Sequence, residues 1–329
     1  MTEPMNLQTY EPTSLRAYEP KNLSEDKSSP VNCLICNAAN HKLLFQSVQD
    51  LEYETYKPVD YIVCRICGLI SQHPLPDKSQ LKDFYPFDYR NYLPVEENIF
   101  SKLKSLQFKS LAKKLSSLLN KKDAKILEIG FGNGQLLLAL QELGYKNLYG
   151  TDFTDRVFLT LQHKGIKLEV SNVEEKIPFN EKFDLIIMNN VIEHFLLPDK
   201  VLASCKGVLS NSGKVVLITP NSKALEFLIF KKYWAGFHAP RHTFIFNSSN
   251  IKMLGDKLGY SKIKVDPIVD PGQLSISIQN MFQDSKITKT NLKNGMSWYL
   301  MLLSLSCAPL AMIENLIGKS TSMLCMLEK

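Results

Sequence analysis

The chain has 329 residues, 44% of them apolar, which is enough for one large α/β domain and a small additional module. The net charge of +6, much of it between Lys102 and Lys125, is too small and too local to indicate a nucleic-acid-binding protein. Residues 1–30 are polar, Pro-containing and without the apolar stretch of a secretory signal. We therefore expect a cytoplasmic protein in a reducing compartment, with a disordered N-terminal tail.

Four of the seven cysteines form two C-x-x-C pairs, Cys33 with Cys36 and Cys64 with Cys67. A two-residue gap lets one tight turn point two thiolates at one ion, and two such turns supply the tetrahedral sulfur shell that Zn²⁺ accepts. The alternatives are a redox pair or four separate core cysteines. Because four sulfur ligands leave no position for water, the predicted zinc ion is structural rather than catalytic.

Hydrophobic periodicity predicts alternating helices and strands after this cysteine region. Leucines at helical spacing predict a helix over 99–120, and further helices are expected over 135–143, before the third strand up to His163, and over 199–209. The expected strands are Lys125–Ile129, Asn147–Thr151, Ile166–Val170, Phe183–Met188, Lys214–Ile218, Ser261–Val265 and Met323–Leu327. This alternation predicts a parallel sheet with right-handed crossovers, whose ligand lies at the carboxyl ends of the strands.

A glycine-rich turn follows the first of these strands. Glu128 is succeeded by Gly130, Gly132 and Gly134, and glycine allows both positive φ and the close approach of a ligand to the backbone. The spacing differs from the dinucleotide fingerprint and lacks the Gly-Lys-Ser/Thr of a P-loop. Asp152, at the tip of the next strand, would face the same crevice and accept hydrogen bonds from a ribose diol; a surface or capping aspartate is the alternative.

This E-x-G-x-G-x-G turn resembles motif I of the class I S-adenosylmethionine (SAM) methyltransferases, and the resemblance extends over about 126–266. It implies a Rossmann-like, seven-stranded, doubly wound sheet whose last strand is antiparallel, and SAM as the cofactor. It also implies that Asn189, at the end of the fourth strand, belongs to the cofactor site. Asn172 occupies the loop where relatives often place an acidic residue near adenine, and its amide oxygen can still accept that hydrogen bond.

Three of the six histidines are expected near the crevice. An acceptor hydroxyl or acidic carbon must lose a proton, and histidine is the natural base because its pKa lies near working pH. His194 follows a strand end, whereas His238 and His242 flank an Ala-Pro-Arg segment. We predict His242 as the base and His194 as the second choice, with His238 as a further candidate. A structural hydrogen bond is the alternative for each.

The segment around these histidines also holds the predicted acceptor-binding residues, Tyr233, Trp234 and Arg241. A guanidinium can hold a phosphate or carboxylate of the acceptor. The cysteine pairs together with Ala-Pro-Arg-His at 239–242 make the layout similar to a bacterial subgroup associated with sugar and surface-polysaccharide modification. The resemblance therefore implies a sugar-like small acceptor, methylated on oxygen or carbon.

A mostly apolar, uncharged stretch follows at 298–313. It is shorter than the roughly 20 residues that span a bilayer. Packed helices or a lid over the acceptor are expected, and a peripheral membrane contact through 298–317 is the alternative. The expected organisation is a tail at 1–30, a zinc ribbon at 31–72, an aromatic and Pro-rich connector at 73–98, and a methyltransferase domain at 99–329 with a helical insertion at about 273–319.

Two other functions compete with a small-molecule methyltransferase. A zinc-ribbon RNA methyltransferase would need a basic ribbon, whereas Asp50, Glu52, Glu54 and Asp60 make this one acidic. A SAM-binding scaffold without turnover would keep the glycines and Asp152 equally well. Nucleic acid is therefore not the favoured partner.

Overall fold

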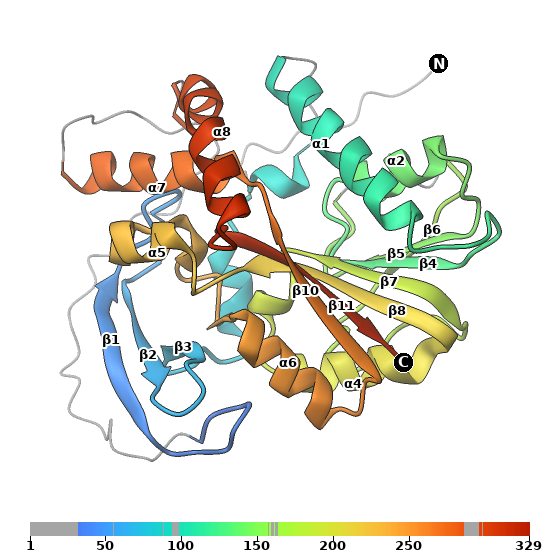
Figure 1. Cartoon of the computed structure of the whole chain (residues 1–329), viewed down its shortest axis with the longest axis horizontal. Helices are drawn as coiled ribbons and strands as arrows, with labels where there is room; N and C mark the ends of the chain where they lie inside the picture. Colours follow the sequence, from blue (N-terminus) through green and yellow to red (C-terminus); the bar gives the residue numbers. More distant parts are fainter. Residues whose placement is uncertain are drawn as a thin grey trace, which may run out of the picture. The chain divides into compact units, whose positions relative to one another are not determined.

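The computed structural model describes residues 32–54, 56–87, 89–93, 99–156, 158, 161, 164–285, 296–297 and 299–329 (Figure 1). The predicted tail at 1–30, most of the helix predicted to end at His163, and Trp298 lie outside these residues.

Seven strands form the large sheet, in the order β10-β11-β8-β7-β4-β5-β6. They are β4 (Ile126–Ile129), β5 (Leu148–Asp152), β6 (Lys167–Val170), β7 (Phe183–Asn189), β8 (Leu209–Pro220), β10 (Lys262–Ile268) and β11 (Ser322–Glu328). Strands β4 to β8 pair in parallel, and β11 is antiparallel to both of its neighbours. The chain reverses its direction of winding between β4 and β7, which opens a crevice at the carboxyl ends of these strands. The predicted doubly wound sheet is confirmed.

Two helical layers cover this sheet because successive strand residues point to opposite faces. In β7, Ile186 and Met188 pack into one core, whereas Leu185 and Ile187 pack into the other. The first core lies under α4 (Pro198–Val208) and α6 (Ser248–Lys257). The second lies under α1 (Ile99–Ser116) and α2 (Gln135–Glu142), on the opposite side of the sheet (Figure 1).

The cysteine region forms a second sheet together with a strand from much later in the chain. Its order is β1-β2-β3-β9, comprising β1 (His41–Val48), β2 (Val59–Cys64), β3 (Ile70–His73) and β9 (Phe244–Ile245). The 3₁₀ helices η1 (Gln80–Phe84) and η2 (Arg90–Tyr92) lie in the connector. Because β9 directly follows the segment that holds His238 and His242, the small sheet attaches the cysteine region to these histidines.

The remaining helices follow β7, β8 and β10 in the chain. They are η3 (Ile192–His194), α5 (Leu225–Phe230), η4 (Lys231–Tyr233), η5 (Ala235–Phe237), α7 (Pro271–Asp284) and α8 (Leu300–Leu316). The last two, which connect β10 to β11 in the chain, pack on each other (Figure 1). The outer face of α8 leaves apolar side chains such as Leu305 and Leu316 more than half exposed. Within the described ranges, no helix is long and apolar enough to cross a membrane. Contact of 298–317 with a membrane surface stays a prediction.

Candidate active site

The glycine turn forms a tight bend between β4 and α2. Gly130 and Gly134 have φ of +69° and +74°. A Cβ at Gly130 would lie 2.5 Å from Val191, and one at Gly134 would lie 2.3 Å from Leu161, so only glycine fits at either position. The backbone N–H of Gly132 donates to Oδ2 of Asp152 at 3.1 Å, which joins the two predicted halves of the cofactor crevice.

Two buried carboxylates face this bend. Glu128 is 3% exposed and Asp152 is 5% exposed, and within the described structure Oε2 of Glu128 and Oδ1 of Asp152 have no hydrogen-bond partner. Burial raises the pKa of Asp152 to about 6, and burial together with the Asp152 charge raises the pKa of Glu128 well above its usual value. Unpaired buried carboxylate oxygens are costly unless a donor reaches them. They therefore fit a ligand that carries hydroxyl or ammonium donors.

The connector forms the outer wall of the crevice. The backbone oxygen of Asn91 would lie 3.2 Å from a Cβ on Gly132. The rings of Tyr85 and Tyr92 pack on Phe153 at centroid distances of 5.3 and 5.6 Å. The segment between the cysteine region and the large domain thus covers the predicted cofactor site and limits the access of water to it.

The two predicted asparagines of the cofactor site lie in different surroundings. Asn172 holds its own loop, because its Oδ1 accepts from the backbone N–H of Glu174 and its Nδ2 donates to Glu175. Asn189 ends β7 and accepts from Nδ2 of Asn190 at 3.4 Å. Asn189 also lines a large cavity next to the predicted cofactor crevice, so it lies between the crevice and this cavity.

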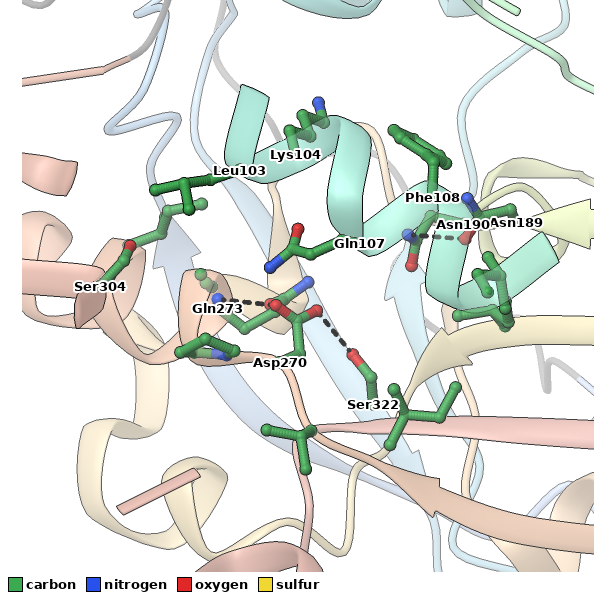
Figure 2. A pocket seen from close by; sticks show the side chains of 18 of the residues that line it. Leu103, Lys104, Gln107, Phe108, Asn189, Asn190, Asp270, Gln273, Ser304 and Ser322 are labelled. Atoms are coloured by element: carbon green, nitrogen blue, oxygen red, sulfur yellow. Dashed lines mark hydrogen bonds between the residues drawn. The ribbon is translucent and has the colours of Figure 1, made fainter. Parts of the chain in front are cut away.

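A separate cavity of about 940 Å³ lies beside the crevice, between α1, the β7 end, α7 and α8. Figure 2 shows Gln107 of α1 across from Asp270 and Gln273 at the start of α7. Asp270 accepts hydrogen bonds from the Ser322 hydroxyl at 3.1 Å and from the Gln273 backbone at 3.4 Å. Lys104 also lines the space, and burial lowers its pKa to about 8. The cavity therefore offers both charged and apolar walls to an acceptor.

The three predicted histidines come together on the wall of this cavity. The ring of His242 lies 4.6 Å from that of His194 and 5.2 Å from that of His238, and all three line the cavity. They reach it from η3 and from the loop between η5 and β9. η3 and this loop are far apart in the sequence but adjacent in the fold, because the backbone N–H of Thr243 donates to the carbonyl of Glu193.

His238 forms a buried pair with Glu52 of the cysteine region. Its Nδ1 lies 2.5 Å from Oε1 of Glu52, and its Nε2 lies 3.3 Å from the hydroxyl of Tyr89. Arg90 contacts the other oxygen of Glu52 at 3.4 Å. Burial, reinforced by the positive charge of Arg241, lowers the pKa of His238 well below its usual value, and burial raises the pKa of Glu52. With a neutral ring and an ionised Glu52, Nδ1 donates to the carboxylate and Nε2 is an acceptor.

His194 and His242 are held instead by backbone carbonyls. Nδ1 of His194 lies 3.0 Å from the carbonyl oxygen of Arg241 and 3.1 Å from the hydroxyl of Tyr85. Nδ1 of His242 lies 2.8 Å from the carbonyl oxygen of Gly236. Burial lowers the pKa of His194 to about 4 and that of His242 well below its usual value. Both rings are thus neutral.

The predicted acceptor-binding residues do not line the cavity. Arg241 is 1% exposed, and its Nη1 and Nη2 donate to Asp50 at 3.1 and 2.9 Å. Trp234 is also 1% exposed and donates to the Thr321 hydroxyl, and the hydroxyl of Tyr233 donates to an aspartate of α7. Their side chains therefore join the cysteine region and the helical insertion to the rest of the fold, and acceptor binding by them stays a prediction.

Sequence reasoning missed Glu52 and Tyr89 as site residues. In the sequence, Glu52 stands out only as one of several acidic residues that argue against RNA binding. It is separated from His238 by 186 positions, and no local motif signals such a contact. The only sequence signal for Tyr89 was the high content of aromatic residues in the connector at 73–98.

The four paired cysteines form one cluster, in which all Sγ atoms lie within 4.8 Å of one another. Cys33 and Cys67 are 3.4 Å apart, and Cys36 and Cys64 are 3.5 Å apart. Zn–S bonds of about 2.3 Å in a tetrahedron place sulfur atoms about 3.8 Å apart, so the cluster fits Zn²⁺ after a small expansion. Backbone N–H groups of Ile66 and Cys67 donate to the Cys64 sulfur, which further favours a thiolate at that position.

Comparison with known proteins agrees with this geometry. Residues 103–265 match the protein family described as "Methyltransferase domain". The tRNA U34 carboxymethyltransferase of Campylobacter hominis is 36% identical over 101 residues, covering 29% of this chain and 35% of that protein. The mitochondrial ubiquinone biosynthesis O-methyltransferase of Bos taurus is 29% identical over 125 residues, covering 34% of each chain. The chain thus spans about a third of the length of these curated relatives.

Among solved structures, a SAM-dependent methyltransferase from Archaeoglobus fulgidus superposes with a TM-score of 0.47 at 18% identity, covering 68% of this chain and 94% of that one. The strand order, the glycine turn and the domain match over residues 103–265 show the Rossmann-like fold of the class I methyltransferases.

Proposed function

We propose that the protein transfers a methyl group from SAM to a small acceptor bound in the 940 Å³ cavity. The observation that carries the proposal is the contact between two parts of the site, since Asn91 packs on Gly132 and also lines the cavity. One is the glycine-lined crevice with two unpaired buried carboxylates, and the other is a cavity lined by a histidine–carboxylate pair. Asn189 lines the cavity at the end of β7, where the two spaces meet.

On the donor side, bound SAM would supply an electrophilic methyl group on a sulfonium. Asp152 would accept from the ribose hydroxyls through its unpaired Oδ1. Glu128 would supply negative charge close to the cationic ligand, and the backbone of the glycine turn would allow close contact. Asn172 is the candidate for the adenine amino group. Covering of this crevice by Asn91 and the connector tyrosines keeps water away from the donor.

On the acceptor side, the geometry supports His238 as the general base more than the first predicted choice, His242. An ionised Glu52 fixes the Nδ1–H tautomer of His238, so that Nε2 faces the Tyr89 hydroxyl as an acceptor and can take a proton. As a proton arrives, the developing imidazolium gains a partner in Glu52, 2.5 Å away. Among the described residues, His242 has no carboxylate within hydrogen-bond distance, and that of Glu193 is 3.9 Å away.

The acceptor we propose is sugar-like and carries an anionic group, methylated on oxygen or carbon. Polar groups such as Gln107, Gln273 and Asp270 can bind hydroxyls, and Lys104 can pair with a phosphate or carboxylate. An RNA acceptor is the alternative, because one of the similar proteins is a tRNA U34 carboxymethyltransferase. Asp50 and Glu52 are buried against Arg241 and His238 and so contribute no charge to the surface of the cysteine region. The exposed Glu54 remains as an acidic group that argues against RNA binding there.

We further propose a structural Zn²⁺ at Cys33, Cys36, Cys64 and Cys67. The ion would hold the turn before β1 to the turn between β2 and β3, and thereby position the loop between β1 and β2 that carries Glu52.

The test combines cofactor binding with transfer. Calorimetry with S-adenosylhomocysteine should detect binding, and labelled SAM should deliver methyl groups to a member of a panel of nucleotide sugars and lipid-linked glycans. His238→Ala should lower turnover at least about 100-fold while cofactor affinity is kept. His41→Ala, a histidine on β1 outside the cavity, is the matched control. Absence of cofactor binding, or full turnover in His238→Ala, would contradict the proposal.

A further inference from the structure

Three side chains that can bind a metal ion lie close together at the wall of the cavity. Glu193, His194 and His242 each bring one ligand atom into a group whose members lie within 4.8 Å of one another. Glu193 is completely buried, and His242 is 4% exposed. None of the three is needed to hold SAM or to form the Glu52–His238 pair.

Backbone carbonyls orient both histidine rings. Nδ1 of His242 faces the carbonyl of Gly236, and Nδ1 of His194 faces the carbonyl of Arg241. A carbonyl oxygen only accepts, so Nδ1 of His242 carries the hydrogen, and the neutral ring keeps its lone pair on Nε2. The ring of His194 contacts the backbone carbonyls of both Arg241 and Asn190, and an ion would replace one of these two contacts. Histidines that bind metals in proteins are oriented in this way, with the other nitrogen donating to a carbonyl or carboxylate.

Glu193 is the third member of the group, and only one of its two carboxylate oxygens has a hydrogen-bond partner among the described residues. Its Oε2 accepts from the Thr219 hydroxyl at 3.0 Å, whereas Oε1 has no hydrogen-bond partner in the described part of the chain. Oε1 lies 3.9 Å from Nε2 of His242, which is too far for a hydrogen bond and close enough for two ligands of one ion. With metal–ligand bonds of about 2.1 Å, ligand atoms lie roughly 3 to 4.2 Å apart.

We propose that Glu193, His194 and His242 bind a divalent transition-metal ion of the zinc and iron class. Two imidazole nitrogens and one carboxylate oxygen are typical of such ions, whereas Mg²⁺ and Ca²⁺ prefer oxygen ligands alone. Three protein ligands leave coordination positions open, and His194 and His242 both line the cavity. The open positions therefore face the space where an acceptor with neighbouring oxygen atoms would bind.

The rival explanation is a proton in place of the ion. Burial raises the pKa of Glu193 to about 8, so the carboxyl can be neutral without a metal. A protonated Oε1 would still lie 3.9 Å from Nε2 of His242, too far to donate to it. The two explanations differ in metal content, which can be measured without any assay of methyl transfer.

The experiment counts Zn²⁺ bound by the purified full chain after equilibration with ZnCl₂ and removal of excess ion. Wild type should bind one equivalent more than Glu193→Gln and His242→Ala, while His238→Ala, from the same cluster of rings, should match wild type. Thr219→Val removes only the hydroxyl that orients Glu193 and should weaken this Zn²⁺ at least about tenfold. Circular dichroism confirms that each variant is folded.

Equal Zn²⁺ content in wild type, Glu193→Gln and Thr219→Val would overturn the proposal in favour of the proton. Since the result is a difference between variants, ions at the cysteine cluster cancel. Loss of the extra ion together with unchanged cofactor binding would separate this site from the donor crevice. The metal site can therefore fail while the methyltransferase function stands, and the reverse also holds.

Discussion

Asp152→Asn should change protein stability and cofactor affinity in opposite directions. In the wild type without ligand, the carboxylate is buried. Its Oδ2 accepts from the backbone N–H of Gly132, and its Oδ1 has no hydrogen-bond partner among the described residues. Its pKa of about 6 compares with 3.8 for a solvated aspartate. At about 1.4 kcal/mol per pH unit, the ionised form costs about 3 kcal/mol of folding free energy above pH 6. An asparagine side chain keeps an oxygen for Gly132 and carries no charge to bury.

The sign of the pH dependence follows from the raised pKa. The native state binds a proton at Asp152 between pH 3.8 and about 6 that the unfolded state releases, so the contribution of this group to stability falls as pH rises through that window. Without ligand, the Asp152→Asn variant should be up to about 3 kcal/mol more stable than wild type at pH 8. At pH 5 the gain should shrink to about half of that value.

The affinity for the cofactor should decrease in Asp152→Asn, although the stability increases. A charged acceptor for ribose hydroxyls is worth about 1.5 to 3 kcal/mol, so S-adenosylhomocysteine should bind Asp152→Asn roughly 10- to 100-fold more weakly at pH 8. Urea unfolding at pH 8 and pH 5, with calorimetry on the same samples, measures both effects. Asp270→Asn is the matched control, because burial also raises the pKa of Asp270 but this residue lines the acceptor cavity. Unchanged affinity in Asp152→Asn, or equal loss in both variants, would refute the reasoning.

Three further predictions follow from the same geometry. Gly132→Ala should weaken S-adenosylhomocysteine binding at least tenfold, whereas Gly144→Ala, also at positive φ but with open space around it, should cost only about 1 kcal/mol of stability; equal affinities would count against the crevice. Glu52→Gln should lower kcat at least about tenfold without changing cofactor affinity, and the exposed Glu54→Gln, from the same loop, should not; identical kcat values would remove Glu52 from the mechanism. Cys67→Ser should lower both the zinc content and Tm, and an unchanged Tm would exclude a structural ion.

The residues of the candidate donor site could be brought together from the sequence because they are close along the chain. Gly132 and Asp152 are 20 residues apart and lie at the ends of neighbouring parallel strands. Strand–turn–helix periodicity places such residues together whatever the rest of the chain does. The seven strands were likewise predictable, since most are short apolar runs and the layers follow from alternation along the strand.

The acceptor half could not be predicted in the same way, because long-range contacts create it. The three histidines could be grouped from the sequence, but their partners could not. Glu52 reaches His238 across 186 positions, and Asp50 reaches Arg241 across 191. Residue types alone suggested that Arg241 binds the acceptor, whereas the fold uses its charge to hold the cysteine region. Periodicity gives no information on such pairings, which depend on how the small sheet attaches to the large domain.

The attachment of the small sheet gives the cysteine region a role in the function that we propose. Strand β3 pairs with β9, so the region shares its sheet with the segment that directly follows the histidines. The pairs Asp50–Arg241 and Glu52–His238 then bring two buried acids from the loop after β1 against two basic side chains of that segment. Each pair is buried, and breaking either leaves an uncompensated charge or an unpaired polar group, which is strongly unfavourable. In the proposed mechanism, the cysteine region therefore acts less as a separate binding module than as the part of the site that fixes the tautomer of the base.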